Sequence, residues 1–203
     1  MFDRTIHMGV ANIVIETVLI VSIVCNILLA AGFIWKSKEA SRDHLTQLKN
    51  YKAFLREFYK YARNAAKKEI PFAVLFVDID HFKNINDQYS HLSGDEAIKA
   101  VGQRLRSEIK STDLIARYGG EEFIVCLKHC TLSEAENVAN RMLRVVSDNP
   151  VNLEKNSIQL TVSIGVAGYP DMPLERLLRT ADKNMYEAKR RGRNRVHAGN
   201  VYV

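Results

Sequence analysis

The hydrophobic residues of this 203-residue chain fall into one long run followed by shorter periodic segments. Residues 9–35 form the long run, in which Glu16 is the single charged residue. A helix needs about 20 apolar residues to cross the hydrocarbon core of a bilayer. A cleavable signal peptide would have a shorter apolar region and a basic start, whereas here Asp3 stands beside Arg4. The pattern therefore predicts a transmembrane helix over residues 9–35, preceded by a short segment at 1–8.

The residues next to this run indicate its orientation. Lys36, Lys38 and Arg42 follow it closely. Because positive residues beside a membrane segment stay on the cytoplasmic side, we expect the C-terminal part of the chain to lie in the cytoplasm. Residues 36–50 are polar and contain neither proline nor glycine, so we expect them to extend the helix as a stalk. The three cysteines form no CxxC pair, which fits a reducing compartment.

The rest of the chain alternates between helical and strand periodicity. Apolar spacing predicts helices over residues 51–68, 94–109, 133–146 and 173–191, and strands over 72–79, 114–118, 123–127, 158–166 and from Val196 onward. Ser133 and Glu136 have the spacing of a capping box at the start of the third helix. The order β-α-β-β-α-β with extra helices predicts an α+β fold of the ferredoxin-like or nucleotide-cyclase (palm-like) type. Such a fold has a central antiparallel sheet with helices on one face.

Acidic residues gather at the end of the first predicted strand and beside a glycine pair. Asp78 and Asp80 lie on the same side of the strand, because alternate residues share a face. Carboxylates at a strand end are suitable magnesium ligands, although Asp80 has a second interpretation as the cap of the following turn. Glu121 and Glu122 follow the glycines in a predicted hairpin. Antiparallel pairing would bring Glu121 to Asp78, and such a carboxylate cluster requires a cation.

A basic cluster that includes Lys189 and Arg193 ends the last predicted helix. It has two interpretations: complementarity to the helix dipole, or a clamp for a triphosphate. The formal net charge of +6 is compatible with a protein that handles polyanions. No P-loop motif is present, so a bound nucleotide would be held in another way.

These motifs together resemble those of a known family. The stretch Arg117–Phe123 resembles the signature of GGDEF domains in its GGEEF form. Further similar motifs are Asp43–Asn50, Asp78–Lys83, Asn86-Asp87, His91, Gly94-Asp95, Ser163–Val166, Ala181-Asp182, Tyr186–Lys189 and Gly192–Asn194. The resemblance covers residues 43–197 and leaves a tail at 198–203. It implies a diguanylate cyclase, an enzyme that condenses two GTP molecules into cyclic di-GMP and releases two pyrophosphates.

The resemblance also implies roles for individual residues. Asp78, the backbone carbonyl of Ile79 and Glu121 would hold magnesium, two ions per active site, with manganese as a substitute. Glu121 or Glu122 would help to deprotonate the 3′-hydroxyl, and Lys83 would stabilise charge on the phosphates. The implied substrate-binding residues are Asn86, His91 and Asp95 near the guanine, Lys189 and Arg193 on the β- and γ-phosphates, and Gly119 and Gly120.

The implied reaction needs a homodimer, because each protomer binds one GTP and the two sites must face each other. The chain would be anchored in the inner (cytoplasmic) membrane of a bacterium through residues 9–35. A separate sensor partner could supply the signal. One alternative is a catalytically silent GGDEF-like module that binds GTP or cyclic di-GMP. A nucleic-acid-binding domain is a weaker alternative, because no aromatic platform lies next to the basic cluster.

Three stretches depart from the family pattern. In the entry motif, Gln47 stands where glycine is usual and Tyr51-Lys52 where paired arginines are common. Ser90 also stands where glycine is usual, and this substitution is expected to shift the guanine loop slightly. The place of an inhibitory Arg-x-x-Asp product site is taken by Lys110 and Asp113. Since lysine cannot make the planar bidentate contact of arginine, we expect weak or absent product inhibition.

Overall fold

The computed structural model describes residues 19–28, 41–152 and 157–199. The chain divides into two compact units, Met1–Ser41 and Arg42–Val203. Within the first unit, residues 19–28 form a helix. No helix among the described residues combines the length and the apolar character needed to cross a membrane. The predicted span at 9–35 lies mostly outside the described residues, as do segment 1–8 and most of the tail.

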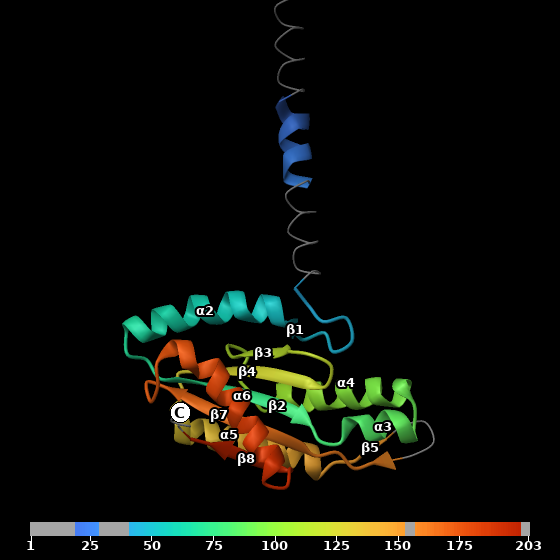
Figure 1. Ribbon diagram of the computed structural model, residues 1–203. Coiled ribbons are helices and arrows are strands. Elements are labelled where there is room, and N and C mark those ends of the chain that lie inside the picture. Colours follow the sequence, from blue (N-terminus) through green and yellow to red (C-terminus); the bar gives the residue numbers. More distant parts are fainter. Residues whose placement is uncertain (1–18, 29–40, 153–156, 200–203) are drawn as a thin grey trace, which may run out of the picture. The chain divides into compact units, whose positions relative to one another are not determined.

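The second unit is built on a six-stranded sheet with the order β1-β3-β4-β2-β7-β8 (Figure 1). Its strands are β1 Lys49–Asn50, β2 Phe72–Ile79, β3 Leu114–Arg117, β4 Glu122–Lys128, β7 Val162–Tyr169 and β8 Arg195–Ala198. Strand β2 pairs antiparallel with both β4 and β7, whereas β1–β3 and β7–β8 are parallel pairs. The sheet is therefore mixed, and the prediction of an antiparallel sheet holds only for its centre. Strands β5 Val151–Asn152 and β6 Ser157–Ile158 form a separate pair.

Helices cover both faces of this sheet, so the prediction of helices on one face is wrong. Helices α2 Tyr51–Lys67 and α6 Leu174–Arg190 pack on one face. Helices α3 Phe82–Gln88, α4 His91–Ser107 and α5 Leu132–Ser147 pack on the other. All eight residues of β2 are buried, and a strand that is apolar on both sides needs cover on both sides. Both hydrophobic cores lie within Arg42–Val203, and we expect this unit to fold without residues 1–41.

Several predicted elements are confirmed and others are shifted. Strand β2 has the predicted bounds, and α2 and α6 agree with prediction to one residue at each end. Helix α5 starts earlier than predicted, because the capping box is made by Thr131 and Glu134. Helix α4 also starts earlier, since the Ser90 hydroxyl accepts a hydrogen bond from the backbone of Ser93. The strand predicted at 158–166 is divided between β6 and β7, and α3 was not predicted.

Residues 41–50 form a turn followed by β1, so the predicted helical stalk is wrong for this part, while residues 36–40 lie outside the described ranges. The Asp43 carboxylate accepts hydrogen bonds from the backbone N–H and the hydroxyl of Thr46, at 2.9 and 2.8 Å. Gln47 follows with a φ of 58°. Such side chain to backbone bonds compete with helix formation, which explains why this polar segment turns. The left-handed backbone at Gln47 is also the physical reason for a glycine at this position in the family pattern.

Candidate active site

An ion pair with a buried carboxylate lies at the C-terminal end of β2. Asp78 is 4% exposed, and its Oδ2 lies 2.6 Å from the Nζ of Lys189 on α6. Burial raises the pKa of Asp78 to about 6, the hydrogen bond and charge of Lys189 act against this rise, and the charges of Glu121 and Glu122 add to it. The site therefore concentrates negative charge where it is poorly solvated, with one lysine as the counter-ion.

The register of β2 and β4 places the two signature glutamates beside Asp78. Glu122, rather than the predicted Glu121, is directly opposite Asp78. The Glu121 carbonyl accepts a hydrogen bond from the N–H of Ile79 at 3.3 Å. Because residues directly opposite in an antiparallel pair share a face, Asp78 and Glu122 project to the same side. Burial raises the pKa of Glu122, Lys189 opposes this rise, and Asp182 and Glu121 add to it.

Close packing of α6 on β7 brings Lys189 to this strand end. A Cβ atom on Gly165 would lie 2.0 Å from the backbone nitrogen of Met185 and 2.1 Å from the carbonyl oxygen of Ala181. Real Cβ atoms do not approach backbone atoms so closely, so a residue with a side chain at 165 would push the helix away. Gly165 therefore sets the distance between the helix that carries Lys189 and the sheet that carries Asp78.

An open cavity of about 540 Å³ adjoins the ion pair. Its lining residues are Glu122, Asp182, Lys183, Met185, Tyr186, Glu187 and Lys189. Of these, only Glu122 and Lys189 were predicted as site residues. The signal for the others is their helical spacing on α6, where residues three and four apart are neighbours. The cavity gives the strand end a space of the size that small-molecule sites occupy.

Asp80 has a structural role, but not as a helix cap. Its carboxylate accepts hydrogen bonds from the hydroxyls of Thr161 and Ser163, at 2.8 and 2.7 Å, and from the backbone N–H of Asn194 at 3.0 Å. The cap position of α3 belongs to His81, which makes no side-chain cap bond. Arg193 and Asn194 both have positive φ, of 58° and 45°. Asp80 thus stabilises the turn that presents Arg193, a link that the sequence does not reveal.

The predicted guanine-binding residues lie on α3 and α4. The side-chain oxygen of Asn86 is buried and has no hydrogen-bond partner in the described part of the chain. A Cβ atom on Gly94 would lie 2.0 Å from that oxygen, so the glycine leaves room for the Asn86 side chain. Asp95, the residue after Gly94 on α4, is half-buried, whereas His91 and Lys83 are exposed. Within residues 41–152 and 157–199, no hydrogen bond or ion pair joins these guanine-binding candidates to the Asp78 cluster.

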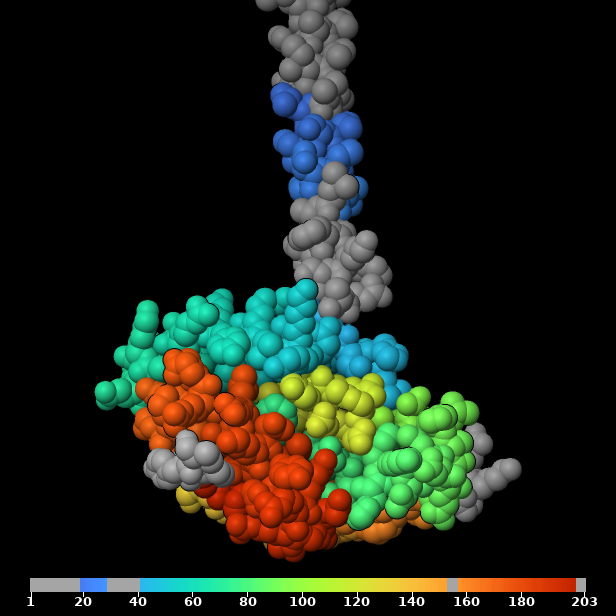
Figure 2. Space-filling model, viewed as in Figure 1, coloured from blue at the N-terminus to red at the C-terminus, as the bar shows by residue number. Residues whose placement is uncertain are grey.

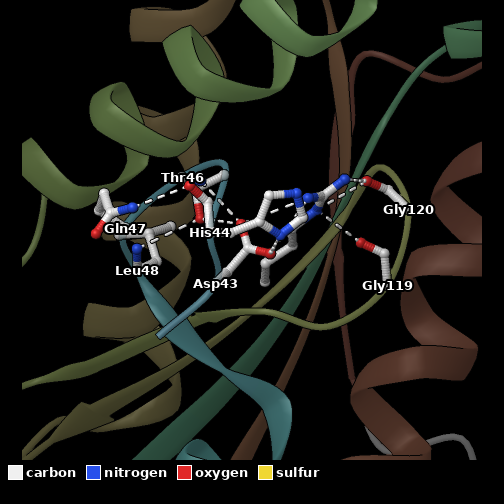
Figure 3. Close-up of polar contacts among 8 residues, drawn as sticks. Asp43, His44, Thr46, Gln47, Leu48, Gly119 and Gly120 are labelled. Carbon is white, nitrogen blue, oxygen red and sulfur yellow. Dashed lines mark hydrogen bonds and ion pairs between the residues drawn. The ribbon is translucent and has the colours of Figure 1, made fainter. Parts of the chain in front are cut away.

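Arg117 holds the glycine pair Gly119-Gly120 by hydrogen bonds to its backbone carbonyls. Its Nε donates to the carbonyls of Gly119 and Gly120 at 3.1 and 3.0 Å, and one terminal nitrogen donates to Gly120 at 2.7 Å. The other terminal nitrogen lies 3.3 Å from the Asp43 carboxylate. Figure 3 shows the Asp43 turn beside the two glycines. A Cβ atom on Gly120 would meet nothing within 4 Å, so the fold itself leaves open space over this backbone.

The predicted inhibitory pair lies in the turn between α4 and β3. Asp113 is 7% exposed, and its two carboxylate oxygens accept hydrogen bonds from the backbone N–H groups of Lys110 and Lys128, both at 3.0 Å. The Lys110 residue is exposed. Asp113 therefore stabilises the turn, and both of its oxygens already have partners.

Comparison with known proteins defines the class. Residues 40–195 match the family described as diguanylate cyclase, GGDEF domain, and the chain belongs to this family. It is 42% identical over 163 residues to the uncharacterized protein YhcK of Bacillus subtilis, covering 78% of this chain and 45% of YhcK. It is 40% identical over 154 residues to diguanylate cyclase A of Treponema denticola, covering 74% of this chain and 41% of the relative. The chain thus spans less than half the length of these curated relatives.

Solved structures confirm the nucleotide-cyclase-like fold. The coiled coil and GGDEF domain of DgcB from Caulobacter crescentus, in complex with c-di-GMP, has a TM-score of 0.84 and 28% identity, over 91% of this chain and 99% of that one. The active GGEEF domain of a diguanylate cyclase from Vibrio cholerae has a TM-score of 0.71 and 30% identity, over 77% of this chain and 100% of that one.

Proposed function

We propose that this protein is an active diguanylate cyclase that condenses two GTP molecules into cyclic di-GMP and releases two pyrophosphates. The observation that carries the proposal is the ion pair of buried Asp78 with Lys189, with Glu122 in register beside it, on a family fold that retains both signature glutamates. A buried carboxylate beside two further acids destabilises the fold, and proteins retain such groups mainly at functional sites, so a silent module would have no need for it.

The donor atoms at the end of β2 fit magnesium. Magnesium prefers oxygen ligands and usually keeps water and phosphate oxygens in its shell. Asp78, Glu121 and the Ile79 carbonyl supply such oxygens, although no group of three His, Cys, Asp or Glu side chains with metal-binding geometry occurs among the described residues. We propose that these atoms hold two ions together with the triphosphate, and that manganese can replace magnesium. Bound metal would neutralise phosphate charge and polarise the α-phosphoryl group.

The remaining site residues bind and orient GTP in this proposal. The unpartnered Asn86 oxygen is an acceptor for a guanine N–H, and Asp95 and His91 lie on the adjoining helix. Lys189 and Arg193 would contact the β- and γ-phosphates, and the exposed Lys83 would stabilise charge on the phosphates. The open space over Gly120 would admit phosphate close to the backbone.

In the proposed reaction, the 3′-hydroxyl oxygen of one GTP attacks the α-phosphorus of the other. An oxygen–phosphorus bond forms, the bond to the β-phosphate breaks, and pyrophosphate leaves. The hydroxyl proton passes to a carboxylate. Glu122 fits this role because it lines the cavity and burial raises its pKa, while Glu121 contributes its charge to the metal site. Two such transfers between facing protomers close the ring, and most of the rate enhancement would come from positioning.

We also propose that the N-terminal segment anchors a homodimer in the inner membrane, with the catalytic unit in the cytoplasm. The helix at 19–28 exposes Leu19, Ile20, Val21, Ile23, Val24, Ile27 and Leu28, each by 48% or more. Large apolar side chains in such a row favour a lipid or a partner helix over water. Alkaline extraction should leave the full chain in the membrane fraction and release residues 41–203. Recovery of the full chain in the soluble fraction would contradict this anchor.

A turnover assay tests the enzyme proposal. Purified protein is incubated with GTP and magnesium, and cyclic di-GMP and pyrophosphate are quantified. Glu121→Ala and Glu122→Ala should abolish product, whereas Glu175→Ala, an exposed change on α6, should not. GTP or cyclic di-GMP binding without product, at high protein concentration, would favour the silent module instead. Residues 41–203 should also lose specific activity on dilution; a constant specific activity would contradict the need for a dimer.

A further inference from the structure

The outer face of α2 carries a row of basic residues. All of them are exposed: Lys52, Arg56, Lys60, Arg63 and Lys67. At 100° per residue they fall within an arc of about 80° on the helix surface. Tyr59 borders the row and is 39% exposed. Together these side chains form what we call the α2 basic face, a strip roughly 25 Å long on a helix of 17 residues.

The charge of this face is not compensated. Glu57 is the one acidic residue of α2, and it pairs with Lys49 of β1 at 2.6 Å. Within the described ranges, none of the five basic side chains takes part in an ion pair or hydrogen bond. The other long helices intersperse both signs, as in the pairs Lys99–Glu96 on α4 and Arg190–Glu187 on α6. An ordinary solvated face would have such a mixture.

The core holds the basic face outward. The opposite side of α2 is formed by Ala53, Phe54, Phe58, Ala62 and Ala65, which are at most 2% exposed. Phe58 packs edge-on against Phe72 of β2, with ring centroids 6.2 Å apart. Because these contacts prevent rotation of the helix, the basic row cannot turn inward. Figure 2 shows α2 on the surface of the folded unit.

We propose that the α2 basic face binds an anionic lipid surface. A straight strip of cations with an adjoining tyrosine matches a plane of headgroups better than a cavity-bound ligand. The chain length also favours this partner. Only residues 36–50 separate the apolar run from Tyr51, so the start of α2 lies within about 55 Å of the proposed anchor even when fully extended. This tether rests on the proposed anchor, but binding by the isolated unit requires neither anchor nor turnover.

The test uses residues 41–203, which contain both cores, and sedimentation with vesicles. Vesicles of phosphatidylcholine containing about a quarter phosphatidylglycerol should bind the protein, and pure phosphatidylcholine vesicles should not. The variant Arg56→Gln/Lys60→Gln/Arg63→Gln should reduce partitioning on the order of 100-fold, since each surface cation contributes about fivefold. A matched control, Arg144→Gln/Arg176→Gln/Arg179→Gln, removes the same charge from exposed positions on α5 and α6. This control should change the partitioning to vesicles less than threefold.

Thermal melting of all variants checks that they remain folded. Equal losses in the two triple variants would mean that net charge, not the α2 basic face, drives binding, and would overturn the proposal. Undiminished binding by the α2 variant would also overturn it. A single-stranded oligonucleotide is tested at the same ionic strength. Binding to it that is tighter than to the vesicles, and that depends on the α2 residues, would assign the face to nucleic acid instead.

Discussion

The guanidinium of Arg117 joins the Asp43 carboxylate, 3.3 Å away, to the backbone of the signature glycines. Asp43 lies at the start of the unit Arg42–Val203, so the first turn of the unit contacts the hairpin that carries Glu121 and Glu122. Both side chains are largely buried, at 16% and 13% exposure. Burial favours protonation of Asp43, but hydrogen bonds from Thr46 and the charge of Arg117 outweigh it and lower the pKa of the carboxyl.

We predict that Arg117→Lys lowers kcat by more than the loss of folded protein accounts for. Lysine keeps the charge but cannot contact Asp43 and two carbonyls at once. The loss of stability should be about 1–2 kcal/mol, and the loss of kcat tenfold or more. Arg144→Lys on the exposed side of α5 is the control. If kcat falls only in proportion to the unfolded fraction, Arg117 merely stabilises the fold.

We predict that Asp78→Asn stabilises the nucleotide-free protein while it abolishes turnover. The pKa of Asp78 rises from an ordinary 3.8 to about 6 on folding. Between these pH values the folded state holds a proton that the unfolded state has released, so stability falls as pH rises through this window. Asparagine has no charge to desolvate. The free energy of unfolding should therefore rise by roughly 1–3 kcal/mol at pH 8 and change little at pH 4. Urea unfolding at both pH values, with exposed Asp87→Asn as control, measures this; a large loss at pH 8 would be the contrary result.

Replacement by alanine should affect stability at one glycine and turnover at another. Gly165→Ala places a methyl group against the backbone of α6, so we predict a loss of stability of about 3 kcal/mol or more. Gly120→Ala meets nothing within 4 Å, so the melting temperature should hardly change, whereas GTP turnover should fall because the methyl group occupies the proposed phosphate space. Unchanged turnover in Gly120→Ala would argue against that space as the phosphate site.

Glycine at the two positions where the family pattern has it should stabilise the protein. Gln47 has a φ of 58° and Ser90 a φ of 154°, both in regions that favour glycine. We predict that Gln47→Gly stabilises the protein by about 1 kcal/mol, and that Ser90→Gly stabilises it by less because it loses the cap of α4. Ser90→Ala, which loses the cap and keeps the strain, should destabilise. Chemical denaturation distinguishes the three variants, and equal effects of glycine and alanine at 90 would contradict the argument.

Product inhibition should be weak. Both oxygens of Asp113 are bonded to backbone N–H groups, and Lys110 replaces an arginine. Initial rates should be insensitive to micromolar cyclic di-GMP, and Lys110→Arg should increase the sensitivity. Strong inhibition of the unaltered protein, abolished by Asp113→Ala in a variant that remains folded, would show that the site is intact.

The sequence by itself determined the elements that depend on local patterns. The apolar run Phe72–Ile79 was sufficient to place β2, and helical spacing was sufficient for α2 and α6. The motif at 117–123 was sufficient to indicate the family and the acidic pair. These features are visible because strand and helix periodicities and turn residues are written within a few positions of each other.

Only the tertiary structure decided which distant groups meet. The register of β2 and β4 put Glu122 rather than Glu121 opposite Asp78, and a one-residue shift in register changes the face of every side chain. The 2.6 Å contact of Asp78 with Lys189 depends on the bare backbone of Gly165, and the bond from Asn194 to Asp80 joins residues far apart in the chain. Such contacts arise from packing between elements, which no local pattern in the chain encodes.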